Sequence, residues 1–121
     1  MSFSHDFIYS IKEYFVPVDT KTKNIIKKIK LKKDNENHSS FSRKEKMNLN
    51  LVNIINEKIK PIYEKLGLTL LNCWVQLYKK DEYHSLHTHF FTQKDYSFVW
   101  FIDGDSNSAP LEFHDVGYPL I

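Results

Sequence analysis

Apolar residues in the middle of the chain recur at intervals of three and four, the spacing of one face of an α-helix. This stripe consists of Val52, Ile55, Ile59, Ile62 and Leu66. Ser42 and Glu45 form a capping-box sequence before the stripe, and Gly67 supplies a stop after it. Pro61 lies inside the repeat and should kink the helix. The pattern therefore predicts a kinked helix over Arg43–Leu66 whose apolar face packs against a sheet.

A shorter and more basic pattern precedes this helix. Lysines dominate residues 21–33, which include no acidic residue, and Ile25, Ile26 and Ile29 fit one helical face. We predict a short basic helix here. It could bind phosphate, but no aromatic residue or Arg is interleaved with the lysines, and this favours a solvated face above an apolar stripe. Short strands are expected at 7–11 and 14–16, and a polar loop at 34–40.

After Gly67 the period changes from about 3.6 to two, which is typical of strands. Strand-like runs cover residues 70–78, 83–89, 96–102 and 111–114. Helices followed by a meander of strands indicate the α+β class. We expect one domain, with a helical support and short N-terminal strands in residues 1–67 and a sheet of jelly-roll type in residues 68–121.

Composition limits the class of protein and its expected cellular location but does not identify a function. The chain has 121 residues, 41% of them hydrophobic and 26% charged, as in an ordinary globular domain. Its net charge of +2 gives no reason to expect a nucleic-acid partner. Cys73 is the only cysteine, so no internal disulfide can form, and a cytoplasmic location is expected. Neither a membrane span nor a signal peptide is visible in the sequence.

Candidate chemistry begins on the first predicted strand of the sheet. Alternation places Trp74, Gln76 and Tyr78 on one face and Cys73, Val75 and Leu77 on the other. A face of Trp, Gln and Tyr is too polar for a plain core. It is typical of a pocket lining, in which a few polar groups orient a ligand.

A histidine pair follows nine residues later. His87 and His89 are two apart, so on an extended chain their side chains point to the same side. Imidazole is the commonest protein metal ligand, so the pair could form two corners of a metal site. The alternative is two surface or hydrogen-bonded histidines. Two ligands bind a metal weakly, and a catalytic site normally needs a third.

Three features of this region occur in a familiar order. Tyr78 precedes His87 by nine residues, and His87-Thr88-His89 forms a His-x-His motif. Two strand-like runs follow, Ser97–Ile102 and Leu111–Asp115. In this order and spacing the stretch from 74 to 115 resembles the Fe(II)- and 2-oxoglutarate-dependent oxygenases, especially the prolyl-4-hydroxylase-like and phage-type members.

The resemblance implies a double-stranded β-helix that holds Fe(II) through two histidines and a carboxylate. It makes His87 the first metal ligand and His89 the second, with Tyr78 and Gln76 assigned to the co-substrate 2-oxoglutarate. Two positions depart from the family pattern. His89 stands where many members have an Asp ligand, so either the triad is all-His or His89 is not a ligand. Asp81 stands where the family's Tyr-x-x-Gly run has Gly.

The resemblance also implies that some of the site lies on later strands. The family's distal His and its basic co-substrate anchor would fall after Ile121, so we expect a truncated jelly roll with little oxygenase turnover. His114 and Asp115 are weaker candidates for the third ligand. The substrate could be a protein side chain, a nucleobase or a small metabolite. The alternative functions are a non-catalytic binding or assembly domain that forms homo-oligomers through exposed strand edges, and a cupin-like metal enzyme that uses no 2-oxoglutarate.

Overall fold

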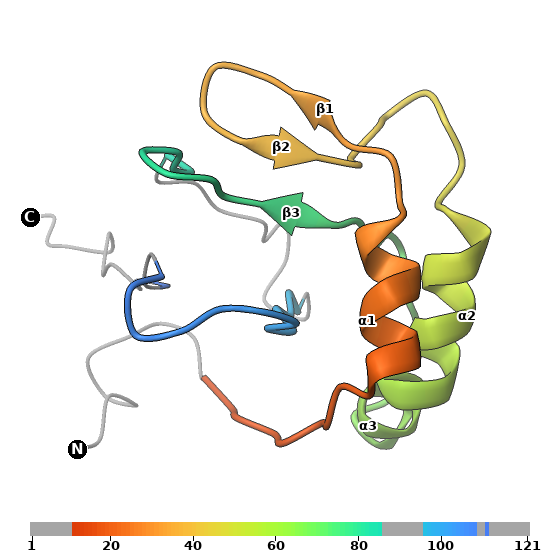
Figure 1. Cartoon of the computed structure of the whole chain (residues 1–121). Coiled ribbons are helices and arrows are strands. Elements are labelled where there is room, and N and C mark those ends of the chain that lie inside the picture. Colours follow the sequence, from red (N-terminus) through yellow and green to blue (C-terminus); the bar gives the residue numbers. More distant parts are fainter. Residues whose placement is uncertain (1–10, 86–95, 109–110, 112–121) are drawn as a thin grey trace, which may run out of the picture.

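The fold was described from a computed structural model, which covers residues 11–85, 96–108 and 111. Three helices and three short strands are present in these residues. They are α1 (Thr20–Lys27), β1 (Lys32–Lys33), β2 (His38–Ser39), α2 (Leu49–Lys58), α3 (Lys60–Lys65) and β3 (Gln76–Leu77). Helices α1 and α2 stand side by side, and the strands lie beyond one end of them (Figure 1). This mixture agrees with the predicted α+β class, but the described residues form no jelly roll.

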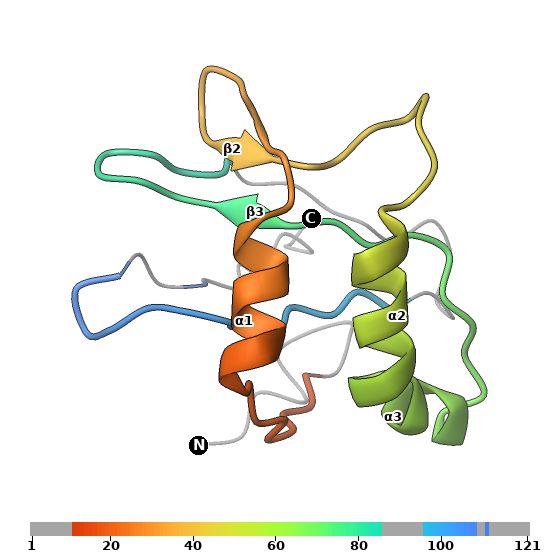
Figure 2. The same cartoon turned by 45° about the vertical axis from the view of Figure 1, so that its right-hand side comes forward.

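The core is built mainly by the helices. Its buried members are Ile26, Leu51, Ile54, Ile55, Ile59 and Cys73. The predicted stripe is partly confirmed, because Ile55 and Ile59 are buried while Val52 and Ile62 are half-buried. Helices α1 and α2 are in contact, and Figure 2 shows their axes roughly aligned.

The predicted start of the long helix is wrong. Ser42 does accept hydrogen bonds from the backbone N–H groups of Lys44 and Glu45, at 3.2 and 3.1 Å, but these bonds close an isolated turn. The helix begins six residues later, where the side chain of Asn48 accepts a bond from Leu51 N at 3.1 Å. Asn is as good an N-cap as Ser, and a start at Asn48 leaves Met47 free to pack against the core.

Pro61 divides the predicted helix rather than kinking it. Helix α2 ends at Lys58, Ile59 has φ −110°, and α3 then begins at Lys60. Proline lacks an N–H group and clashes with the preceding turn inside a helix, but the first turn tolerates it. The predicted stop is confirmed, because Gly67 has φ 72° and the N–H of Leu68 reaches the carbonyl of Tyr63 at 3.0 Å.

The lysines of the predicted basic helix are partly neutralised by acidic side chains. Asp103 lies 3.2 Å from Lys23 Nζ and 3.1 Å from Lys27 Nζ. The apolar side of α1 is in the core, where Ile26 is buried. This arrangement matches the structural interpretation of the basic run, a charged face above an apolar stripe, and not a free phosphate-binding patch.

The three strands form one antiparallel sheet in the order β1-β2-β3. His38 pairs with Leu77 and Ser39 with Gln76, and the pairing continues through Ser40 N to Val75 O at 2.9 Å. The predicted strands were too long, because only 76–77 of run 70–78 is a strand and 14–16, 83–85 and 96–102 have none. A strand needs a neighbour for its backbone groups, which alternation alone does not supply. Residues 7–10, 86–89 and 112–114 lie outside the described part of the chain.

The segment 96–102 nevertheless faces the core roughly as its pattern predicted. Trp100 and Ile102 pack against the buried cluster, and the indole N–H of Trp100 donates to Val16 O at 3.0 Å. Alternation would place Phe98 on the face of Trp100 and Ile102, but Phe98 is 44% exposed. In the described residues no helix is long and apolar enough to cross a membrane.

Candidate functional site

The polar face predicted on the first strand of the sheet is present around β3. Cys73 is buried and Val75 packs against the core, whereas Trp74, Gln76 and Tyr78 form a hydrogen-bonded row on the other face. Leu77, predicted on the core face, is instead 41% exposed. Burial raises the pKa of the Cys73 thiol, so this cysteine serves packing rather than reaction. The row of three is the starting point of the candidate site.

Gln76 lies at the centre of this row. Its Oε1 accepts a bond from Trp74 Nε1 at 3.1 Å. Its Nε2 donates to Tyr78 at 3.4 Å and to Asn37 Oδ1 at 2.9 Å. Phe41 packs edge-on against Trp74, with ring centroids 4.7 Å apart, and fixes the other end of the row. Both nitrogen protons of Gln76 are therefore used inside the protein.

A tight turn after β3 folds the chain back toward Tyr78. Glu82 N donates to Lys79 O at 3.0 Å, and Asp81 at the third position of the turn has φ 66°. A positive φ at this position is the requirement of a type II turn, where Gly is the usual residue and Asp one of the few tolerated alternatives. The family-pattern position that has Asp instead of Gly thus adopts a glycine-like conformation.

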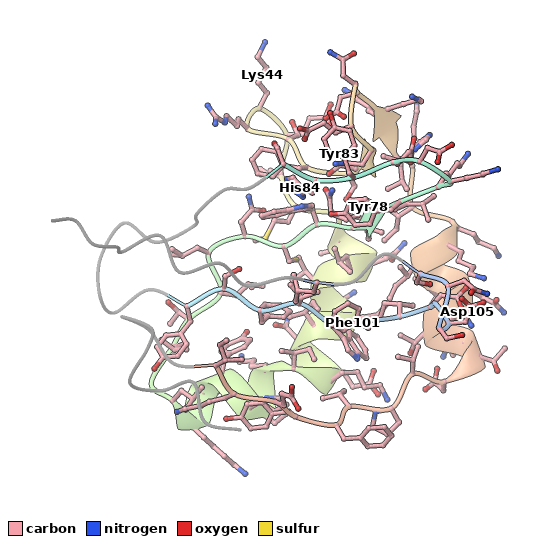
Figure 3. All side chains as sticks on the ribbon, turned by 90° about the vertical axis from the view of Figure 1, so that its left-hand side faces the viewer. Lys44, Tyr78, Tyr83, His84, Phe101 and Asp105 are labelled. Atoms are coloured by element: carbon pink, nitrogen blue, oxygen red, sulfur yellow. The ribbon has the colours of Figure 1, made fainter. Side chains whose placement is uncertain are left out.

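His84 meets Tyr78 as a result of this turn. The Tyr78 hydroxyl and His84 Nδ1 are 3.0 Å apart. Figure 3 shows Tyr78, Tyr83 and His84 gathered on one side of the molecule, well away from Asp105. The Tyr78 side is open to solvent, since this residue is 41% exposed. Part of the Tyr78 side chain is therefore accessible to a ligand.

The turn is held in place by a charged cluster. Glu82 Oε1 accepts bonds from Lys79 N at 2.8 Å and from His38 Nδ1 at 2.9 Å, and Lys33 Nζ lies 3.8 Å from its Oε2. The backbone bond from Lys79 is the main cause that lowers the pKa of Glu82, and His38 adds to it. His38 is half-buried, and its bond to Glu82 fixes β2 to the turn.

The structure brings together only some of the predicted site residues. Gln76 and Tyr78 are adjacent, as expected of a shared lining. The predicted metal ligands His87 and His89 lie outside the described residues, as do His114 and Asp115. Within the described ranges, no three His, Cys, Asp or Glu side chains lie close enough together to hold a metal ion.

Two residues of the candidate site were missed by the sequence analysis. Asn37 was assigned to a polar loop, but it is only 3% exposed and bonds to Gln76. The spacing of Asp34 and Asn37 was the available signal, because Asp often accepts bonds from backbone groups two and three residues later in a turn. His84 lies in the predicted strand run 83–89, where nothing in the sequence indicated a contact with Tyr78. Its contact with Tyr78 depends on the turn between them.

Comparisons with known proteins give no relative. No family model matches the chain, and neither curated proteins nor solved structures give a significant match.

Proposed function

We propose that this chain is a domain like those of the Fe(II)- and 2-oxoglutarate-dependent dioxygenases, in which the row on β3 lines the co-substrate pocket. One observation carries the proposal. The turn after Tyr78 has a positive φ at Asp81, the position at which the resembling family has Gly, and it returns His84 to the Tyr78 hydroxyl. Three residues separate His84 from His87, a length of chain that spans at most about 11 Å.

The described residues fit part of such a site. The hydroxyl of Tyr78 has a single proton, which faces Nδ1 of His84 in the ligand-free chain and which in this proposal turns to a carboxylate, the group that 2-oxoglutarate presents. The indole of Trp74 and the amide of Gln76 are bonded to each other, so in this proposal they orient Tyr78 and close the wall beside it. His87 and His89 would supply imidazole ligands suited to Fe(II), with a third ligand still to be assigned.

In this proposal the protein contributes binding and orientation. Bound Fe(II), 2-oxoglutarate and O2 would supply the oxidising chemistry for hydroxylation of a substrate. Tyr78 would hold one end of the co-substrate, and the apolar rings of Trp74 and Phe41 would limit water on that side. The double-stranded β-helix is part of the proposal, as is the substrate class: a protein side chain, a nucleobase or a small metabolite.

Metal binding by the histidine pair is the first test. Co(II) titration, followed by visible absorption and by calorimetry, should give saturable binding in the wild-type chain. A His87→Ala, His89→Ala double variant should lose it, whereas His38→Gln, which alters a histidine bonded to Glu82, should retain it. Equal binding by the wild type and the double variant would contradict the proposal.

The alternative of an assembly domain has less support. Strand β1 is one of the two edges of the described sheet, with β3 at the other, and both residues of β1, Lys32 and Lys33, are exposed. Lysines on an edge strand oppose pairing with a second copy. Sedimentation at low salt should therefore show a monomer. A dimer that survives Lys32→Glu and Lys33→Glu substitutions would point to a different interface.

A further inference from the structure

We propose that Asn37 is a positioning residue for the Tyr78–His84 pair. It holds the amide of Gln76 in one orientation and thereby sets the direction in which Tyr78 donates its hydroxyl proton. The catalytic meaning of this role rests on the function proposed above. The hydrogen-bond arrangement itself rests only on the described residues.

The side-chain amides of Asn37 and Gln76 each face a group that can only donate or only accept a hydrogen bond, which fixes the orientation of each amide. The carbonyl of Tyr83 can only accept, so the group 2.9 Å from it must be Nδ2 of Asn37. Asn37 Oδ1 is then the acceptor that faces Gln76. From the other end, the indole N–H of Trp74 can only donate, so Oε1 of Gln76 must face it. The two ends give the same orientation for Gln76.

This orientation determines the role of the Tyr78 oxygen. Gln76 Nε2 donates one proton to Asn37 Oδ1 at 2.9 Å and the other to the Tyr78 oxygen at 3.4 Å. Because that oxygen accepts from Gln76, its own proton is available for Nδ1 of His84 at 3.0 Å. A neutral His84 would then have its proton on Nε2. Hydrogen-bond donation therefore runs from Gln76 through Tyr78 to His84, and Asn37 accepts the other proton of Gln76.

Asn37 is suited to be the fixed point of this row. It is 3% exposed, and its backbone is held by Asp34 on both sides. Its N–H donates to Asp34 Oδ1 at 2.9 Å, and its carbonyl accepts from Asp34 N at 3.0 Å. Its side chain also fixes the return segment through the Tyr83 carbonyl. The buried side-chain amide of Asn37 therefore fixes the direction in which the Tyr78 hydroxyl donates, and it also holds the segment that includes His84.

The tautomer of His84 shows directly whether Tyr78 donates its hydroxyl proton to His84. We would record ¹⁵N shifts of the imidazole nitrogens at about pH 8.5, where an ordinary histidine is neutral. Wild type should show the proton on Nε2. Gln76→Glu removes both N–H donors, so Tyr78 turns its proton toward the carboxylate and the His84 proton should move to Nδ1. Asn37→Ala, which frees the amide of Gln76 to turn, should give a mixture of tautomers.

Asn35→Ala is the matched control, because Asn35 lies in the same turn but is exposed. It should leave the His84 tautomer unchanged. A tautomer unaltered in both Gln76→Glu and Asn37→Ala, with each variant folded by circular dichroism, would overturn the positioning role.

A binding measurement separates this role from the proposed function. In the Co(II)-loaded chain, Asn37→Ala should weaken 2-oxoglutarate binding by about two- to tenfold, the range for one hydrogen bond, and leave Co(II) affinity unchanged. A tautomer shift in a chain that binds no 2-oxoglutarate would support the positioning role and overturn the proposed function. Equal weakening of Co(II) and 2-oxoglutarate binding would overturn the positioning role, because it indicates a general loss of structure.

Discussion

The hydroxyl of Tyr78 lies 3.0 Å from Nδ1 of His84, although six residues separate them in the sequence. The contact depends on the turn at Lys79–Glu82, which reverses the chain within four residues. Strand β3 and the return segment are both fixed to Asn37, through Gln76 and through the Tyr83 carbonyl. The buried Asn37 side chain therefore holds Tyr78 through Gln76 and His84 through the neighbouring Tyr83 carbonyl.

The first prediction concerns the strained position in this turn. Asp81 has φ 66°, which an L-residue other than Gly adopts at a cost. We expect Asp81→Gly to raise the free energy of unfolding by up to about 1 kcal/mol, because the strain removed exceeds the flexibility added to the unfolded chain. Chemical denaturation measures this change.

Lys80→Gly is the matched control for this prediction. Lys80 occupies the preceding position of the same turn and does not have a positive φ. Gly there adds flexibility to the unfolded chain without relieving strain, so it should lower stability. A loss of stability in both variants would mean that Asp81 is favourable in its own conformation.

The second prediction tests the core. Ile55 is 3% exposed, whereas Leu49 on the same helix is 72% exposed. Ile55→Ala should reduce the free energy of unfolding by about 2–5 kcal/mol through lost burial and a residual cavity. Leu49→Ala should change it by no more than about 0.5 kcal/mol. Similar losses in urea denaturation would show that the core has been assigned to the wrong face of α2.

The third prediction concerns how the stability of the protein falls at low pH. Backbone bonds from Asn37 and then Glu36 hold the pKa of Asp34 below its ordinary value. A lowered pKa in the folded state stabilises the protein above the unfolded-state pKa, and this contribution is lost as the pH falls through the folded-state value. We expect Asp34→Asn, whose amide oxygen can still accept both bonds, to flatten the fall in stability between about pH 5 and pH 2.

Thermal unfolding across that pH range checks the third prediction. Asp34→Asn and wild type should differ most near neutral pH and converge in acid. The other low-pKa carboxylates, Asp19, Glu82 and Asp103, stay in both proteins and leave a common residual slope. A difference that grows as the pH falls would have the wrong sign and would reject this account.

The parts of the fold that depend on local sequence were predictable. The stripe that includes Ile55 and Ile59 followed from helical spacing, and Gly67 marked the helix end. The alternation around β3 correctly separated buried Cys73 from Gln76 on the opposite face. Each of these features is set by the residue itself and by neighbours within one or two turns.

Features that depend on distant partners were not predictable from the pattern. Ser42 and Asn48 both satisfy the local rule for a helix start, and the packing of Met47 against the core agrees with the later one. Asn37 and Gln76 are 39 residues apart, and nothing in either segment indicates the other. The lengths of the strands were overestimated for the same reason, because a backbone ladder requires a partner strand.

The proposed function requires that the face of β3 binds a carboxylate co-substrate beside a histidine-held metal. Calorimetric titration of 2-oxoglutarate into the Co(II)-loaded chain tests it most directly, with the metal-free chain and Tyr78→Phe titrated in parallel. We predict binding that requires the metal and is weakened about two- to tenfold by Tyr78→Phe, which removes one hydroxyl and keeps the ring. No 2-oxoglutarate binding to the metal-loaded chain, or binding that is the same with and without metal, would contradict the claim.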